Sequence, residues 1–277
     1  MTAHLRWWKE AIYVLAFYGV YSWIRNQFGS ESVSYEHAFD NAKEMIQVER
    51  WLGLYHEETL QEWFLDDRWF IQFWNLFYGT FHFVVTTFCI FWLFRRFKDR
   101  YTKYRTTLAV TTALALIGFA TYPLLPPRLL PESYGFVDTL RVYGGLWSFD
   151  SGTMQKISNQ YAAMPSLHFG WSMWCAMVLV PTVRRPWLKV LAASYPALTL
   201  FAIMVTANHY WIDAAGGAVI LLGGWLAGSW WSRRLEARGI ERGATQQDGW
   251  VESGEARQRN GELARPLPHA ERSEAGP

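Results

Sequence analysis

The pair His209 and Asp213 has the spacing of a nucleophile and the residue that orients it. The two lie four residues apart in the stretch 208–213 (NHYWID), so a helix that starts here places both side chains on one face, with Asn208 as a suitable N-cap. A carboxylate that accepts a hydrogen bond from one imidazole nitrogen leaves the other nitrogen free to attack. We predict that His209 is a nucleophile; the alternative is that Asp213 only satisfies a buried histidine.

A second histidine, His168, follows a predicted helix start in the stretch 164–168 (MPSLH). Ser166 suits the N-cap of that helix. The free N–H groups and the positive dipole end of such a terminus bind anions, so we predict a phosphate oxygen beside Ser166. His168 in the first turn is then placed to protonate a leaving oxygen, unless it is an interfacial histidine without a catalytic task.

The candidate cation is Arg128, which follows two prolines that stiffen the backbone. A guanidinium can bind two phosphate oxygens at once, whereas a snorkelling interfacial arginine would bind none. Arg141 and Lys156 lie in the same loop and are further candidates for contact with a phosphate or headgroup.

The composition indicates that membrane helices position these residues. The 277 residues are 51% apolar and include 17 Trp, and a mean hydropathy of -0.04 conceals apolar blocks separated by charged loops. A bilayer core of about 30 Å requires about 20 residues of helix. We predict an all-α fold, a polytopic membrane helical bundle over residues 1–231 with six transmembrane helices, at approximately 8–24, 69–94, 106–125, 166–183, 187–206 and 211–231.

Basic clusters set the predicted orientation. They lie at 4–9, 95–105, 184–189 and 233–238, which six spans place on one side of the membrane. Both termini are therefore predicted to be cytoplasmic, and the three motif stretches extracytoplasmic. The expected location is the plasma membrane.

Three other regions complete the predicted organisation. Segment 30–67 is acidic but carries Leu60, Trp63 and Phe64 at helical spacing, which suits interfacial amphipathic helices or, alternatively, an anchored soluble loop. Segment 126–163 is an extracytoplasmic loop whose length suggests a function. The tail 232–277 has too few apolar residues to fold and is predicted to be a disordered cytoplasmic segment.

His82 shares a helix face with Tyr78 and Asn75. At 1.5 Å per residue it lies about 20 Å along the second predicted span, too deep for easy contact with the three motif stretches. Either these residues line a lipid headgroup cavity or they are packed against neighbouring helices.

The stretches 164–168 and 209–213 resemble two motifs of the type 2 phosphatidic acid phosphatase superfamily, a Pro-Ser-Gly-His stretch and a Ser-Arg stretch leading to His-x-x-x-Asp. The Pro-Ser-Leu-His variant, Tyr210 after the second histidine and the stretch 126–128 (PPR) are most similar to the inositol phosphorylceramide synthase-like branch. The resemblance covers roughly residues 122–231. Tyr210 joins the candidates for headgroup contact.

The resemblance implies a phosphohistidine at His209, oriented by Asp213, with His168 as the acid and with Ser166 and Arg128 holding phosphate oxygens. It implies no metal and no other cofactor. The expected partners are a lipid phosphate substrate and an alcohol or water acceptor. Thr121, Leu167 and Ile203 replace the family's Lys, Gly and Arg, respectively. The resulting shortage of cations argues against highly charged diphosphate substrates.

Other classes of protein are disfavoured or left open. A net charge of +2 gives no basis for nucleic-acid binding. A metal-dependent enzyme using His168, His209 and Asp213 as ligands is one alternative. A transporter whose polar groups line a solute path is another. Oligomeric state cannot be read from the sequence.

Overall fold

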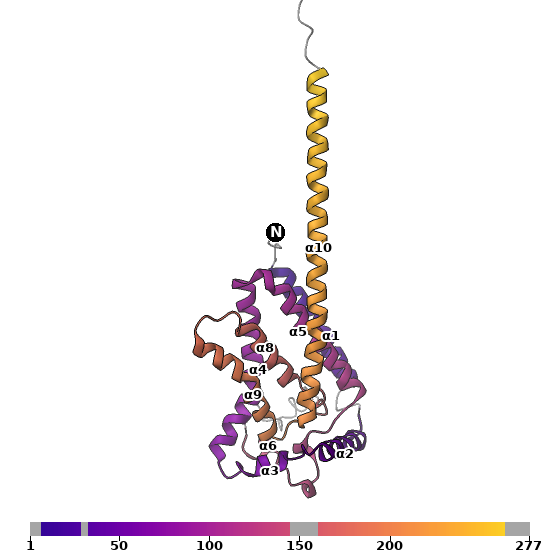
Figure 1. Ribbon diagram of the computed structural model, residues 1–277. Helices are drawn as coiled ribbons and strands as arrows, with labels where there is room; N and C mark the ends of the chain where they lie inside the picture. Colours follow the sequence, from indigo (N-terminus) through magenta and orange to yellow (C-terminus); the bar gives the residue numbers. More distant parts are fainter. Residues whose placement is uncertain (1–6, 29–32, 145–159, 264–277) are drawn as a thin grey trace, which may run out of the picture. The chain divides into compact units, whose positions relative to one another are not determined.

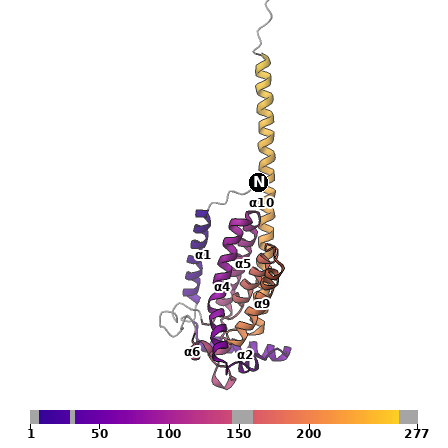
Figure 2. The same cartoon turned by 90° about the vertical axis from the view of Figure 1, so that its left-hand side faces the viewer.

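The computed structural model describes residues 7–28, 33–144 and 160–263, and within these ranges the fold is helical, with no β-strand and one isolated bridge between Leu124 and Ala162 (Figures 1 and 2). The chain divides into two compact units, Thr2–Trp231 and, with Met1, Ser232–Pro277. The helices are α1 (Trp7–Phe28), α2 (Tyr35–Leu52), α3 (Glu57–Glu62), α4 (Arg68–Arg96), α5 (Lys98–Thr121), the 3-10 turns η1 (Pro127–Leu129) and η2 (Glu132–Tyr134), α6 (Thr139–Val142), α8 (Leu167–Leu179), α9 (Pro186–Val205) and α10 (Trp211–Leu263).

The core of the first unit lies among α4, α5, α8 and α9 (Figure 1): α4, α8 and α9 contact one another, and α5 contacts α4 and α8. Aromatic and aliphatic side chains from all four helices form this core, among them Trp74, Tyr104, Trp174 and Tyr195. The first turns of α10 join it through glycines. A Cβ on Gly217 would clash with the Ser166 carbonyl oxygen at the start of α8, so only glycine permits this approach.

Among the residues that the structure describes, three helices are long and apolar enough to cross a membrane: α4, α9 and the part of α10 from Trp211 to Arg238. The predicted all-α membrane fold is confirmed to this extent. α8 is apolar but has 13 residues, about 20 Å of helix and less than a bilayer core. With α1 and α5 also outside this set, the count of six transmembrane helices stays a prediction.

The acidic segment forms two helices, α2 and α3. Ser34 caps α2, and Gly53 ends it in the left-handed conformation. One stripe of α2 is buried, and it packs on Leu124, Leu125 and Tyr210. α2 is therefore amphipathic, and its buried face points into the protein. The residues on which the amphipathic prediction rests lie elsewhere, with Leu60 in α3 and with Trp63 and Phe64 just after it. Contact with a membrane interface stays a prediction.

Segment 126–163 contains η1, η2 and α6, and its residues 145–159 lie outside the described ranges. In the tail, α10 continues to Leu263 where the composition predicts disorder. A shortage of apolar residues argues against a packed core, but it does not exclude helical hydrogen bonds within the segment, even though packing supplies most of the stability of helices in proteins. Residues 264–277 lie outside the described ranges.

Candidate active site

The two predicted catalytic histidines touch each other. His209 lies in the link between α9 and α10 and is 3% exposed. Its Nδ1 lies 3.2 Å from Asp213 Oδ2, and its Nε2 lies 3.4 Å from His168 Nδ1. An ionised carboxylate only accepts hydrogen bonds, so Nδ1 of His209 carries the proton and Nε2 presents a lone pair. His168 Nδ1 is then the donor in the contact between the two rings.

Backbone hydrogen bonds fix the arrangement of these residues. The Ser166 N–H donates to the Asp213 carbonyl at 2.8 Å, which ties the start of α8 to the start of α10. The link before α10 turns through Ala207, whose φ of 52° is uncommon for a residue other than glycine. Strain of this kind costs about 1–3 kcal/mol and clusters at functional sites. Here it lies two residues before His209.

Ser166 is the N-cap of α8, as the sequence predicts. Its Oγ accepts from the Phe169 N–H at 3.4 Å, and the residue is fully buried. This places His168 in the first turn of α8, two residues after the cap. Phosphate binding there stays a prediction.

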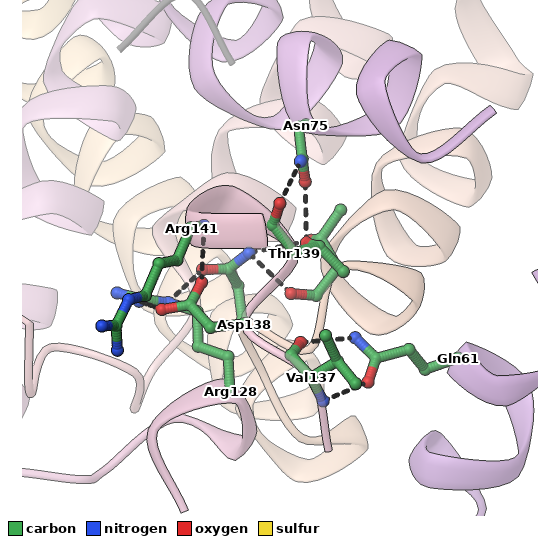
Figure 3. Close-up of polar contacts among 9 residues, drawn as sticks. Gln61, Asn75, Arg128, Val137, Asp138, Thr139 and Arg141 are labelled. Atoms are coloured by element: carbon green, nitrogen blue, oxygen red, sulfur yellow. Dashed lines mark hydrogen bonds and ion pairs between the residues drawn. The ribbon is translucent and has the colours of Figure 1, made fainter. Parts of the chain in front are cut away.

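Arg128 is held by Asn208 and Asp138. Its Nε donates to Asn208 Oδ1 at 3.0 Å. One terminal nitrogen donates to Asp138 Oδ2 at 2.9 Å, and Figure 3 shows Arg128 beside Asp138. Its N–H donates to the Ala207 carbonyl, which brings the arginine next to the link that carries His209. The predicted capping role of Asn208 is wrong, because its side-chain amide donates to Thr206 and accepts from Arg128.

Two buried amides hold the loop that carries Asp138. Gln61 exchanges hydrogen bonds with the backbone of Val137, and Asn75 donates to the carbonyls of Thr139 and Gly144 and accepts from the Thr139 hydroxyl (Figure 3). Asn75 therefore positions the loop. The prediction that it contacts a headgroup or lines a cavity is corrected, since its amide is occupied on both sides.

His82 and Tyr78 lie against the general-acid candidate. The Tyr78 ring stacks on His168 at a centroid distance of 4.3 Å, and the His82 ring meets His168 edge-on at 4.2 Å. The prediction that His82 is too deep for contact with the motifs is wrong. Distance along one helix does not fix the level of its neighbour, and the first turn of the short α8 meets α4 beside Tyr78 and His82.

The remaining candidates differ in position. Tyr210 is fully buried and its hydroxyl donates to the Leu125 carbonyl at 3.0 Å, so it holds two segments together where headgroup contact was predicted. Burial and the nearby Asp213 carboxylate raise the pKa of Tyr210, which keeps this hydroxyl protonated. Arg141 is exposed, and its backbone N–H contacts Asp138 (Figure 3). Lys156 lies outside the described residues.

Three acidic residues near the site were missed. Asp138 pairs with Arg128, while Glu49 and Glu57 are fully buried at the start of α10. Glu49 could have been found from the sequence, because its helical spacing places it on the same face of α2 as Ala38, Ala42 and Met45. A carboxylate on an otherwise apolar helix face marks a buried polar contact.

Two of the three departures from the family motifs can be located relative to the site. Ile203 is fully buried in an apolar cluster, and Thr121 is exposed with its hydroxyl bonded to the Ile117 carbonyl. Neither supplies a charge. In the described part of the chain, no group of three or more His, Cys, Asp or Glu residues is arranged to hold a metal ion. His168 and Asp213 contact opposite nitrogens of His209, so one ion cannot be bound by all three.

Comparison with known families gives one match. The family model described as the PAP2 superfamily matches residues 43–227, a stretch that contains His168, His209, Asp213 and Arg128. No curated protein and no solved structure matches the chain. The match covers well over half of the sequence, from within α2 to within α10. The chain belongs to the PAP2 superfamily.

Proposed function

We propose that this protein is an integral membrane enzyme that moves the phosphoryl group or phospho-headgroup of a lipid, with His209 as the nucleophile. Membership of the PAP2 superfamily suggests a phosphatase or phosphotransferase of lipid phosphates. The observation that carries the proposal is the His209 ring, with Asp213 on one nitrogen and His168 on the other. This is the arrangement of an oriented nucleophile beside a proton donor.

In the first step, Nε2 of His209 attacks phosphorus, and an N–P bond forms as the bond to the leaving oxygen breaks. His168 gives its proton to that oxygen, and Asp213 stabilises the positive charge on His209. In the second step, His168 removes a proton from water or an alcohol, whose oxygen attacks phosphorus and releases His209. Because the two ring nitrogens are 3.4 Å apart, a phosphoryl group that binds between them must separate the rings.

Arg128 and the N-terminus of α8 at Ser166 are the proposed phosphate ligands. Arg128 supplies the positive charge, and the free N–H groups of α8 supply donors. The apolar Ile203 and the neutral Thr121 reduce the positive charge relative to the family motifs, which favours lipid phosphate mono- and diesters over diphosphates. We further propose transfer of phosphoinositol to a lipid alcohol as the reaction, with hydrolysis when water is the acceptor, at the extracytoplasmic face of the plasma membrane.

The test uses the purified full-length protein in mixed micelles with phosphatidic acid or phosphatidylinositol, each radiolabelled at phosphorus, with and without ceramide. Label in water-soluble products reports hydrolysis, and label in a new lipid reports transfer. His209→Ala should lower kcat by about 10³-fold or more, as loss of a covalent nucleophile does. An acid-labile, base-stable phosphoenzyme should form only with His209 present. Turnover retained by His209→Ala, or an inactive wild type with both lipids, would overturn the proposal.

A further inference from the structure

The start of α10, which carries Asp213, is bound by carboxyl groups from three different elements. The N–H of Ile212 donates to Glu49 Oε1 at 2.9 Å, that of Trp211 to Glu57 Oε1 at 3.3 Å and that of Tyr210 to Asp213 Oδ2 at 2.9 Å. A helix start leaves such N–H groups without intrahelical partners. Two of the three are bound here by residues of the acidic segment.

The two glutamates are crowded together without enough hydrogen-bond donors. Both side chains are fully buried, and their carboxyl groups accept from the N–H groups of two consecutive residues, Trp211 and Ile212, which brings the two carboxyl groups together. Oε2 of Glu49, Oε2 of Glu57 and Oδ1 of Asp213 are buried and accept no hydrogen bond from any residue that the structure describes. Two ionised carboxylates cannot donate to each other, so a stable contact needs a proton between them.

We infer that Glu49 and Glu57 share one proton and act as positioning residues, holding the start of α10 and with it the His209–Asp213 pair in the reactive arrangement. The inference rests on the proposed function. It gives the acidic segment a task inside the protein, separate from contact with a membrane.

The surroundings of the pair support a shared proton up to alkaline pH. Burial, followed by the hydrogen bond with Glu57 and its charge, raises the pKa of Glu49 to about 9. The titratable groups that face the pair are Tyr55, Tyr210 and Asp213. Burial raises the pKa of Tyr55 to about 12 and that of Tyr210 above its usual value, so neither tyrosine ionises before the pair does.

Activity is therefore expected to fall as pH rises through about 9, because loss of the shared proton leaves adjacent negative charges beside Asp213. Glu49→Gln mimics the protonated acid: its amide oxygen can accept from Ile212 and its NH₂ can donate to Glu57. This variant should keep kcat near wild type at pH 7 and move the alkaline midpoint upward by about one pH unit or more. Coincident midpoints for wild type and Glu49→Gln would overturn the inference.

Removal of the side chain tests positioning. Glu49→Ala should lower kcat for phosphatidic acid at pH 7 by about tenfold or more with KM within about threefold, because a small displacement of reacting groups has a large effect on rate. Glu62→Gln, at an exposed position of α3, is the matched control and should resemble wild type. A smaller kcat effect of Glu49→Ala, or a change confined to KM, contradicts the inference.

Thermal unfolding followed by tryptophan fluorescence gives a readout independent of turnover. The unfolded chain releases the Glu49 proton near pH 4.5 whereas the folded protein keeps it to about pH 9, so wild-type stability should fall with rising pH across this window. Glu49→Gln has no acidic proton at this position, so its stability should not fall in this way. The difference between its Tm and that of wild type should therefore grow from pH 6 to pH 9. If the Tm values of wild type and Glu49→Gln changed in parallel with pH, the inference of a shared proton would be overturned. A wild type without His209-dependent turnover would instead overturn the proposed function. The dependence of Tm on pH would still show whether Glu49 and Glu57 share a proton.

Discussion

At the scale of single residues, the two ring nitrogens of His209 have different functions, and the Asp213 carboxylate determines which of them carries the proton. Its carboxylate accepts from Nδ1 and leaves the Nε2 lone pair toward His168. Asp213→Asn can present an NH₂ to Nδ1 and so favours the other tautomer. We expect kcat for lipid phosphate release to fall by about 10³- to 10⁴-fold, with little change in KM. Asp66→Asn, at an exposed position, is the control, and a loss below about tenfold would contradict the assigned role.

Arg128 should not be replaceable by lysine. Its guanidinium bonds to Asn208 and Asp138 at the same time, and a single ammonium cannot reproduce that fork. Arg128→Lys should raise KM for phosphatidic acid by about tenfold, the loss expected for one charge-assisted hydrogen bond. Arg141→Lys changes an exposed side chain of the same loop and should leave KM unchanged. Equal effects of the two variants would show that Arg128 has no special contact with phosphate.

Spacing along the chain predicted two contacts between residues three or four positions apart, although α10 begins at Trp211 and His209 lies in the link before it, not in the helix that the spacing predicted. The His209–Asp213 contact and the Ser166 cap follow from positions four and three residues apart, and both are present. Contacts between distant segments were not predictable in this way. Glu49 reaches Ile212 because α2 packs across the start of α10, and local spacing carries no information about such packing.

At the scale of helices, the site depends on how closely α10 approaches α8. A methyl group at Gly217 would clash with the Ser166 carbonyl oxygen, which is backbone and cannot move aside alone. Gly217→Ala should therefore shift His168 relative to His209, lowering kcat by about tenfold or more and lowering Tm. In Gly223→Ala the new Cβ meets only the Leu114 side chain, at 3.1 Å, so this variant is the control. Similar activities of the two variants would contradict a role for close packing.

Helix existence was easier to predict than helix ends. The apolar blocks predicted each main helix, whereas the third was predicted to extend from 106 to 125 and the structure has it over Lys98–Thr121. Pro123 and Pro126 disfavour helical backbone before them, and the Leu124 N–H donates instead to the Tyr161 carbonyl. α5 begins before the predicted residue 106, and its first turns contain charged residues, which a search for apolar residues does not include.

At the scale of the whole membrane unit, alternating helix direction explains why distant motifs converge. The end of α5, the start of α8, the end of α9 and the start of α10 all contribute to one site. Helices that run alternately up and down bring these ends to the same side of a bundle. The order of apolar blocks therefore predicted the convergence, while the side of the membrane on which it lies rests on the basic clusters alone.

That side can be tested with two engineered cysteines, since the native Cys89 and Cys175 are both buried. Glu132→Cys lies in η2 between α5 and α8, and Arg184→Cys lies between α8 and α9; both positions are exposed. In intact cells, an impermeant maleimide should label Glu132→Cys, and it should label Arg184→Cys only after permeabilisation. Of the six predicted spans, the one that contains α8 separates the two positions, and α8 is only about 20 Å long, so labelling of both from outside would mean that this span does not cross. In that case, the loop carrying Arg184 would share the face of the catalytic histidines, and neither the six-span bundle nor its orientation would stand.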